Sequence, residues 1–247
     1  MRYFSIYMKL FYHRVIFSVF GLCLAFLALC SCATRIEGAL AADGSASLSV
    51  GVALEQQITL LAQRLSAAGG QGGGPVLDGP EISRSMAAAG GVASAALRNT
   101  GPAAIEGQIR ISAISAFLSA ADGRGFIEFA QSGTGGRCLI NISRENGPAI
   151  IELLSPQIAD FLNALMAPLA TGEELSRAEY LELVASFYNR AISDEIAASR
   201  IRASIDFPGT VTSVRGGTSS GRRVNFDIPL VDLLVLETPL SYEVRWN

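Results

Sequence analysis

The sequence predicts an α+β domain, in which helices cover one face of an antiparallel β-sheet. Several segments alternate apolar and polar side chains at every second residue, which is the pattern of strands with one buried and one hydrated face. Other segments repeat apolar side chains at helical spacing, and they lie between two blocks of strands, an order typical of α+β folds. The chain has 247 residues, of which 50% are hydrophobic, so it can bury the core of one domain.

The strand alternation recurs along most of the chain. In the clearest segment, Ile109 and Ile111 alternate with Gln108 and Arg110. An antiparallel sheet with one hydrated face accounts for this pattern, because successive side chains of a strand point to opposite faces. The same alternation predicts strands over 46–52, 105–113, 200–207, 224–228 and 240–246.

Turn residues predict how some strands are joined. Glycines from Gly133 to Gly136 are expected to close a hairpin between 126–131 and the strand that contains Cys138. Asn146-Gly147 is a strong hairpin signal, because both residues tolerate the backbone angles of a tight turn. Pro208-Gly209 is expected to join one strand that ends at Phe207 to another that begins at Val211.

Helix start signals accompany the apolar stripes. Ser176 and Glu179 have the spacing of a capping box, in which each side chain binds the backbone N–H of the other residue. Pro156 follows a serine and suits the first position of a helix, where its missing N–H costs nothing. Further helices are predicted over 54–65, more weakly over 81–89, and from Ser193 as a short last helix.

The amino-terminal segment has the order of a secretory signal peptide. Three basic residues and no acid precede an apolar run from Val15 to Leu29, which is shorter than the roughly 20 residues of a membrane-spanning helix. The run ends in Leu-Cys-Ser-Cys-Ala over 29–33, which resembles the bacterial lipobox. The resemblance implies cleavage after residue 31 and attachment of diacylglycerol to Cys32. Cys30 is the alternative acceptor, although the leucine before it is bulkier than the position prefers, and an uncleaved signal anchor is a further alternative.

Small residues predict two segments outside the packed core. Residues 32–43 are expected to form a tether, so that a single domain extends over 44–247 and a chain beginning near Asp43 folds by itself. Residues 66–101 are rich in glycine and alanine. We expect them to form a mobile insert, because they lack the bulky apolar side chains that would hold them in a core.

The predicted mature chain contains neither lysine nor histidine. The single lysine and the single histidine precede Cys32, which leaves 22 acidic residues and 16 arginines, a net charge of about −6. A Ser-His-Asp or Cys-His catalytic site and a P-loop are therefore excluded. Zinc is disfavoured because Cys138 is the only other cysteine, and no calcium-binding loop motif is present. We predict no metal, no cofactor and, from the acidic balance, no nucleic acid as a partner.

Two candidate sites have structural interpretations. Glu173 and Glu174 follow Thr171 at an expected helix start, where two carboxylates complement the helix dipole rather than form an acid–base pair. Cys138 alternates in phase with isoleucines, so we predict a buried thiol, with Arg137 on the opposite face and unable to lower its pKa. No catalytic residue is predicted.

Arg215, Arg222 and Arg223 flank a glycine-rich hairpin over 216–221. Three guanidinium groups and free backbone amides at a hairpin tip could hold phosphate or carboxylate groups. This triad is therefore the candidate anion-binding site, with solvated hairpin charges as the alternative interpretation.

The carboxyl-terminal third contains Ala-Ser-Ile-Asp-Phe-Pro-Gly-Thr-Val over 203–211, followed by Gly221, Val224 and Phe226. This order of strand, Phe-Pro-Gly turn, valine strand, glycine hairpin and aromatic strand resembles the repeated segment of LppM-type bacterial lipoprotein domains. Phe226 stands where that family usually has tryptophan. The resemblance implies a β-rich domain that faces the cell envelope, and it carries over no catalytic residue.

These observations together predict a membrane-anchored lipoprotein, exposed to the periplasm, that acts as a non-enzymatic binding or scaffold module. Its expected partners are the membrane, through the lipid anchor, and an anionic lipid or envelope polymer. One alternative is an envelope enzyme that uses carboxylates on glycan or peptidoglycan. Another is a lipid-carrying domain with an apolar cavity.

Overall fold

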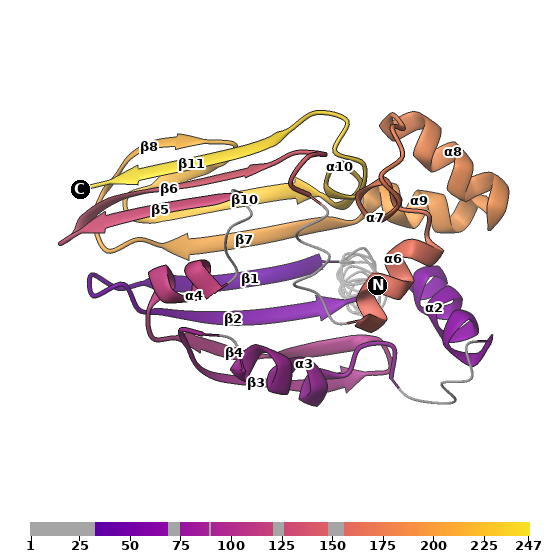
Figure 1. Cartoon of the computed structure of the whole chain (residues 1–247), viewed down its shortest axis with the longest axis horizontal. Coiled ribbons are helices and arrows are strands. Elements are labelled where there is room, and N and C mark those ends of the chain that lie inside the picture. The colour runs from indigo at the N-terminus through magenta and orange to yellow at the C-terminus, as the bar shows by residue number, and fades with distance from the viewer. Residues whose placement is uncertain (1–32, 69–74, 89, 121–125, 148–155) are drawn as a thin grey trace, which may run out of the picture. The chain divides into compact units, whose positions relative to one another are not determined.

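The structure is a computed structural model that describes residues 33–68, 75–88, 90–120, 126–147 and 156–247, all within one compact unit. The predicted signal peptide over 1–31, the predicted lipidation site Cys32 and its alternative Cys30 lie outside these residues. The fold is α+β, as predicted, with two β-sheets and a group of helices at one end (Figure 1). Within the described part of the chain, no helix is long and apolar enough to cross a membrane.

The larger sheet, called sheet A, has seven strands in the order β3-β4-β2-β1-β7-β10-β9. Neighbouring strands are antiparallel except β1 and β7, which pair in parallel. The sheet is therefore mixed, whereas the prediction was an antiparallel sheet. A parallel pair needs a long connection, and the helical block between β6 and β7 forms part of it. The strands are β1 Ala33–Leu40, β2 Ala46–Ala53, β3 Val92–Gly101, β4 Ala104–Ile111, β7 Arg200–Asp206, β9 Thr218–Ser220 and β10 Arg223–Pro229.

The smaller sheet, called sheet B, is antiparallel with the order β5-β6-β11-β8. The hairpin predicted around Gly133 is confirmed as the β5–β6 connection. The Pro208-Gly209 turn passes the chain from sheet A to sheet B, because the strand after it pairs with β11 and not with β7. The turn at Asn146-Gly147 is present, but the strand predicted after it lies outside the described residues. The strands are β5 Ile127–Ser132, β6 Gly135–Ile142, β8 Val211–Arg215 and β11 Leu240–Trp246.

Strand β1 corrects the prediction of a tether over 32–43. It pairs with β2 on one side and β7 on the other, and so joins the two halves of sheet A. Small residues let its neighbours approach closely: a Cβ at Gly38 would lie 2.4 Å from Cδ2 of Leu48. A chain that begins near Asp43 would lack this strand, so from the structure we expect that such a chain does not fold by itself.

The predicted mobile insert over 66–101 contains two packed elements, α3 (Gly79–Ala87) and β3. The hydroxyl of Ser83 in α3 accepts a hydrogen bond of 2.7 Å from the Leu97 N–H in β3, and the Asn99 side chain accepts one of 3.1 Å from the Gly79 N–H. An ideal Cβ on Gly79 would lie 3.1 Å from the Arg98 backbone, so the small residue permits a close helix–strand contact. Residues 69–74 and 89 of this segment lie outside the described part.

A helical block lies at one end of the sheets (Figure 1). Its buried core contains Tyr180, Val184 and Ile196, all with an exposed fraction of 0%. The capping box predicted at Ser176 and Glu179 is confirmed at the start of α8. Helix α9 begins at Arg190, not at Ser193 as predicted. The helices are α2 Gln56–Ala68, α6 Pro156–Ala164, α7 Pro168–Thr171, α8 Arg177–Phe187, α9 Arg190–Ala198 and α10 Leu230–Val235.

The apolar face of sheet A is covered by two different layers. Sheet B packs on the half around β7 and β10, where Val224 and Phe207 meet Val244 and Trp246. Helices α3 and α4 (Ile114–Ala120) pack on the half formed by β2, β4 and β3. The prediction of helices covering one face is therefore correct only for this second half.

Candidate functional site

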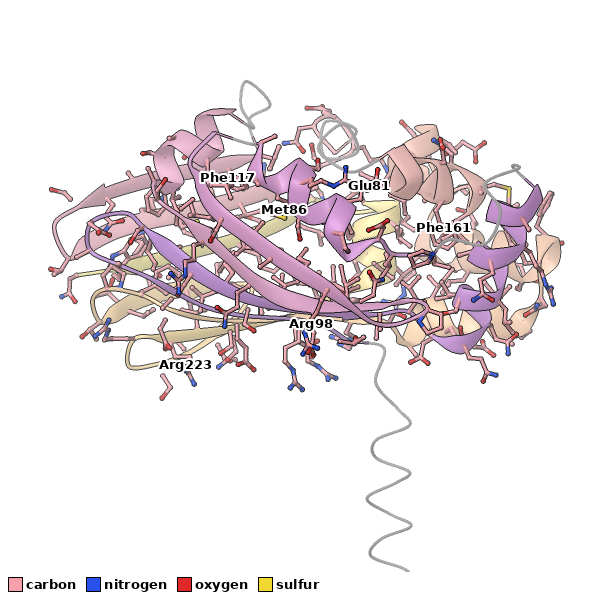
Figure 2. The ribbon with its side chains drawn as sticks, turned by 90° about the horizontal axis from the view of Figure 1, so that it is seen from below. Glu81, Met86, Arg98, Phe117, Phe161 and Arg223 are labelled. Carbon is pink, nitrogen blue, oxygen red and sulfur yellow. The ribbon has the colours of Figure 1, made fainter. Side chains whose placement is uncertain are left out.

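The other face of sheet A is polar and exposed, and it is called the open face below. Side chains that face each other in register across neighbouring strands share this face. One such row runs from Arg98 through Glu106 and Arg35 to Arg202 and Asp227. Figure 2 shows Arg98 and Arg223 on this side of the sheet, while Met86 and Phe117 lie on the opposite side.

The open face carries more arginines than acids although the mature chain is acidic. Six arginines and four carboxylates lie on it, a net charge of about +2. Several are paired at the surface, including Arg223 with Asp206 through two hydrogen bonds of 2.6 and 2.9 Å. This pairing lowers the pKa of the Asp206 carboxyl below its usual range. The charged residues are Arg35, Arg98, Arg110, Arg200, Arg202 and Arg223 with Glu37, Glu106, Asp206 and Asp227.

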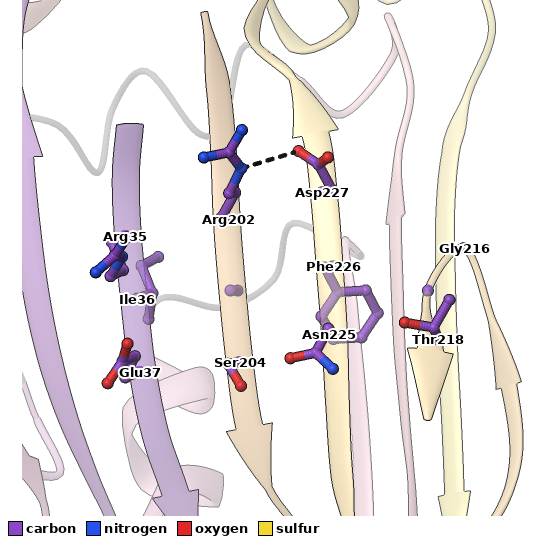
Figure 3. A pocket seen from close by; sticks show the side chains of 12 residues that line it. Arg35, Ile36, Glu37, Arg202, Ser204, Gly216, Thr218, Asn225, Phe226 and Asp227 are labelled. Atoms are coloured by element: carbon purple, nitrogen blue, oxygen red, sulfur yellow. Dashed lines mark ion pairs between the residues drawn. The ribbon is translucent and has the colours of Figure 1, made fainter. Parts of the chain in front are cut away.

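A trough of about 570 Å³ crosses the open face over β1, β7 and β10 and reaches the turn before β9. Figure 3 shows its polar side chains standing on neighbouring strands. Hydroxyl and amide groups lie beside charged groups, so the trough offers both donors and acceptors of hydrogen bonds. The polar side chains that line it are Arg35, Glu37, Arg202, Ser204, Thr218, Asn225 and Asp227.

Arg35 and Arg202 give the trough its electrostatic character. They face each other in register on β1 and β7, so two like charges are held side by side. Arg202 lies 3.8 Å from Asp227 (Figure 3). Asp227 also accepts a hydrogen bond of 2.6 Å from Arg200. Arg35 makes no ion pair with any described residue, so its guanidinium donors are available to a ligand with anionic oxygens.

The structure does not bring the predicted triad Arg215, Arg222 and Arg223 together. Arg215 belongs to sheet B, whereas Arg223 lies on the open face of sheet A. Arg222 donates a hydrogen bond of 2.8 Å from Nε to the Phe207 carbonyl oxygen. The three residues are neighbours in sequence, but the hairpin between them passes from one sheet to the other.

Arg215 belongs instead to a different cluster, centred on Glu243 and called the Glu243 cluster. Arg137 and Arg245 each donate from Nε to Glu243 Oε1 at 2.8 Å, and Arg215 donates to Oε2 at 2.7 Å. Glu243 is 6% exposed, because the arginine side chains screen it from solvent. The hydrogen bonds from Arg137 and Arg245 lower the pKa of this carboxyl, so it stays ionised.

The remaining candidates have structural roles. Glu173 and Glu174 are exposed in the segment between α7 and α8. Neither lies in the first turn of α8, whose N-cap is Ser176. Cys138 lies on the apolar face of its strand, as predicted, and packs between the two sheets, where burial raises the pKa of its thiol to about 11. Arg137 extends to the other face of sheet B, also as predicted. In the described residues, no group of three or more His, Cys, Asp or Glu side chains could hold a metal ion.

Sequence reasoning missed the trough and the Glu243 cluster for one reason. The alternation of 200–207 correctly places Arg202 and Ser204 on a hydrated face. It does not say which strand lies beside that face, and β1 was not expected to be a strand. The register of β1 against β7 is what places Arg35 next to Arg202.

Comparisons with known proteins leave the family of this chain open. No family model matches the sequence, and no curated protein matches it. One solved structure with a similar arrangement is the NMR structure of the folded domain of Mycobacterium tuberculosis LppM, with a TM-score of 0.35 and 10% sequence identity over 87% of this chain and 88% of that one. A likeness of this size carries no argument about ligand or activity, so the site is interpreted from its own geometry.

Proposed function

We propose that this chain is a lipid-anchored envelope protein that acts as a non-enzymatic binding module, with the open face of sheet A as its binding surface. The observation that carries the binding role is the trough over β1, β7 and β10. In the trough, Arg35, which makes no ion pair with a described residue, lies next to Arg202 and beside hydrogen-bonding side chains. Such a surface fits a polar ligand with phosphate or carboxylate oxygens.

The lipid anchor is supported by the sequence over 29–33, which resembles a lipobox, and by the apolar run before it. A secreted chain with this motif would be held at the cell membrane on its periplasmic side. The proposal assigns no metal, cofactor or nucleic acid to the protein.

Lowered pKa values make four carboxyl groups poor candidates for the acid catalyst of an envelope glycosidase. A glycosidase needs one carboxyl group whose pKa is raised, so that it can donate a proton near neutral pH. In the described residues, Asp43, Glu179, Asp206 and Glu243 have lowered pKa values, because hydrogen bonds stabilise their ionised forms. These four groups therefore suit salt bridges and helix or turn capping and not acid catalysis.

The charged and hydrogen-bonding side chains of the trough favour this proposal over a lipid carrier. A carrier buries acyl chains in an apolar cavity. Ile36, Ala203 and Phe226 also line the trough, but the Phe226 ring packs edge-on against Tyr242 at 5.6 Å. The trough is consequently suited to polar groups.

Lipid labelling tests the anchor. We expect that Cys32→Ala abolishes incorporation of a palmitate analogue and leaves an unprocessed precursor, while the matched variant Cys30→Ala is labelled like the wild type. Equal labelling of the wild type and Cys32→Ala would contradict the assignment, and loss of label only in Cys30→Ala would move it to Cys30.

Native mass spectrometry of the full chain, purified in detergent, tests the binding role. We expect a bound polar species on the wild type that is lost in Ser204→Trp, because the indole fills the trough. The control Ser213→Trp places the same side chain on the outer face of sheet B and should keep the species. A species that survives in Ser204→Trp, or that is absent from the wild type, argues against the trough.

A further inference from the structure

We infer that the open face of sheet A lies against the membrane that holds the lipid anchor and contacts its anionic headgroups. This inference rests on the proposed function, because it takes Cys32 as the lipidated residue. It adds which surface of the domain meets the membrane and what chemistry that surface recognises.

The first step is the length of chain between the anchor and the sheet. Strand β1 begins at Ala33, directly after the proposed lipidation site, so no tether separates the domain from the membrane. Three residues connect Cys32 to Arg35, a span of at most about 11 Å at 3.3–3.6 Å per residue. Arg35 is therefore held near the headgroups, at a distance comparable to the screening length of about 8 Å at physiological ionic strength.

The second step is the charge of the open face at that end of β1. The side chains in register with Ala33 and Arg35 on β7 are Arg200 and Arg202. Asp227 on β10 is the acid that neutralises them, at 2.6 Å from Arg200 and 3.8 Å from Arg202. Three arginines against one carboxylate leave a local charge of about +2 close to the anchor.

The helical block, the other surface near the anchor, has the opposite charge. The helical block also lies at this end, because α9 leads directly into β7. Six acidic residues and three arginines lie on the helices of this block, namely α2, α6, α8, α9 and α10. An anionic membrane repels this acidic end and attracts the open face, so electrostatics select the orientation in which the sheet lies on the surface.

Site-directed thiol labelling on vesicles tests this orientation. The full lipidated chain is reconstituted into vesicles of phosphatidylcholine, with or without phosphatidylglycerol, and reacted with a maleimide polymer. Reporters are Ser49→Cys on the open face, Ser213→Cys on the outer face of sheet B and Ser186→Cys on α8. The native Cys138 is partly buried between the sheets, and each rate is corrected for the chain without an added cysteine.

We expect Ser49→Cys to react about fivefold more slowly when phosphatidylglycerol is present, as arginines near an anionic surface imply, whereas the other two reporters keep their rates. Adding Arg35→Gln and Arg202→Gln should remove this protection. Adding Arg64→Gln and Arg84→Gln, exposed arginines of α2 and α3, makes the same change of charge away from the face and should leave the protection intact.

Two outcomes would overturn the inference: equal labelling of Ser49→Cys on both kinds of vesicle, or protection of Ser186→Cys instead. Failure of the proposed anchor is seen separately, because an unlipidated chain does not float with vesicles of phosphatidylcholine alone. A chain that floats with neutral vesicles but shows no protection at position 49 keeps the anchor and refutes the orientation.

Discussion

The outer faces of the two sheets use the same charged side chains in different ways. On sheet B, three arginines converge on Glu243 and occupy both of its carboxylate oxygens. On sheet A, the ion pairs are spread along the strands, and Arg35 and Arg110 make none with described residues. The arginines of sheet B are therefore held by one shared, buried carboxylate, whereas those of sheet A leave guanidinium donors open to a ligand.

The positions of the strands explain the difference. Glu243 lies on β11 between β6 and β8, so Arg137 on β6 and Arg215 on β8 reach it from both sides. On sheet A, Glu37 on the central strand β1 has serines in register on both neighbouring strands, so no arginine stands directly opposite it. Register, more than composition, decides which arginines are neutralised.

The largest expected effect comes from removing β1, which breaks the open face into two halves. A chain that begins at Asp43 should show no cooperative thermal unfolding in far-ultraviolet circular dichroism, because β2 and β7 lose their shared neighbour. The control chain begins at Ala33 and should unfold cooperatively. A cooperative transition at the same temperature in both chains would show that β1 is dispensable.

The next effect compares one carboxylate from each outer face. Glu243→Gln leaves three arginines without their shared carboxylate and should lower the melting temperature by on the order of 5 °C or more. Glu106→Gln breaks an exposed pair with Arg98 on the open face and should lower it by about 2 °C at most. Differential scanning calorimetry of the two variants measures both shifts, and equal shifts would refute the contrast between the faces.

Acid should reduce the difference between wild type and Glu243→Gln. The pKa of Glu243 is lowered in the folded state, mainly by the hydrogen bond from Arg137, from the ordinary value of 4.5. Its contribution is therefore complete above the unfolded-state pKa and is lost as the pH falls through the lower, folded-state pKa. Melting temperatures measured from pH 7 down to pH 3 should show the gap narrowing below about pH 4.5. A gap that stays constant over this range would contradict the role of the ionised carboxylate.

The smallest expected change in melting temperature comes from substituting an arginine that makes no ion pair, compared with one that binds Glu243. Arg35→Gln should change the melting temperature by no more than about 1 °C, because exposed side chains without an ion pair contribute little to stability. Arg137→Gln should lower it by about 2 °C or more, since it removes a donor from Glu243 and its contact with Glu128. If Arg35→Gln were the more destabilising of the two, Arg35 would have a structural role and not a free guanidinium.

Strong local signals predicted their elements correctly. The capping box at Ser176 and Glu179 marks the start of α8, and the alternation around Ile109 marks β4. In the same way, the phase of Cys138 within its strand correctly placed the thiol between the sheets. These features depend on a few adjacent residues, so the sequence determines them before any tertiary contact forms.

Elements and boundaries that were missed or only weakly predicted depend on partners far away in sequence. Strand β3 was missed and helix α3 was predicted only weakly. Ile82 and Met86 of α3 belong to the same apolar cluster as Leu97 of β3, and Ser83 accepts a hydrogen bond from the Leu97 N–H. The start of α2 is capped by Glu195 of α9, which accepts hydrogen bonds of 3.0 and 2.9 Å from the N–H groups of Gln57 and Ile58. Such contacts leave no pattern in the local sequence.

Sequence patterns were enough to predict the α+β class, most strands and helices, and which of their side chains face water or the core. They could not show that β1 joins two half-sheets, that Arg35 lies beside Arg202 or that Arg215 binds Glu243. The physical reason is that periodicity fixes the face on which a side chain lies, whereas strand order and register fix its neighbours. A candidate binding site depends on the neighbours.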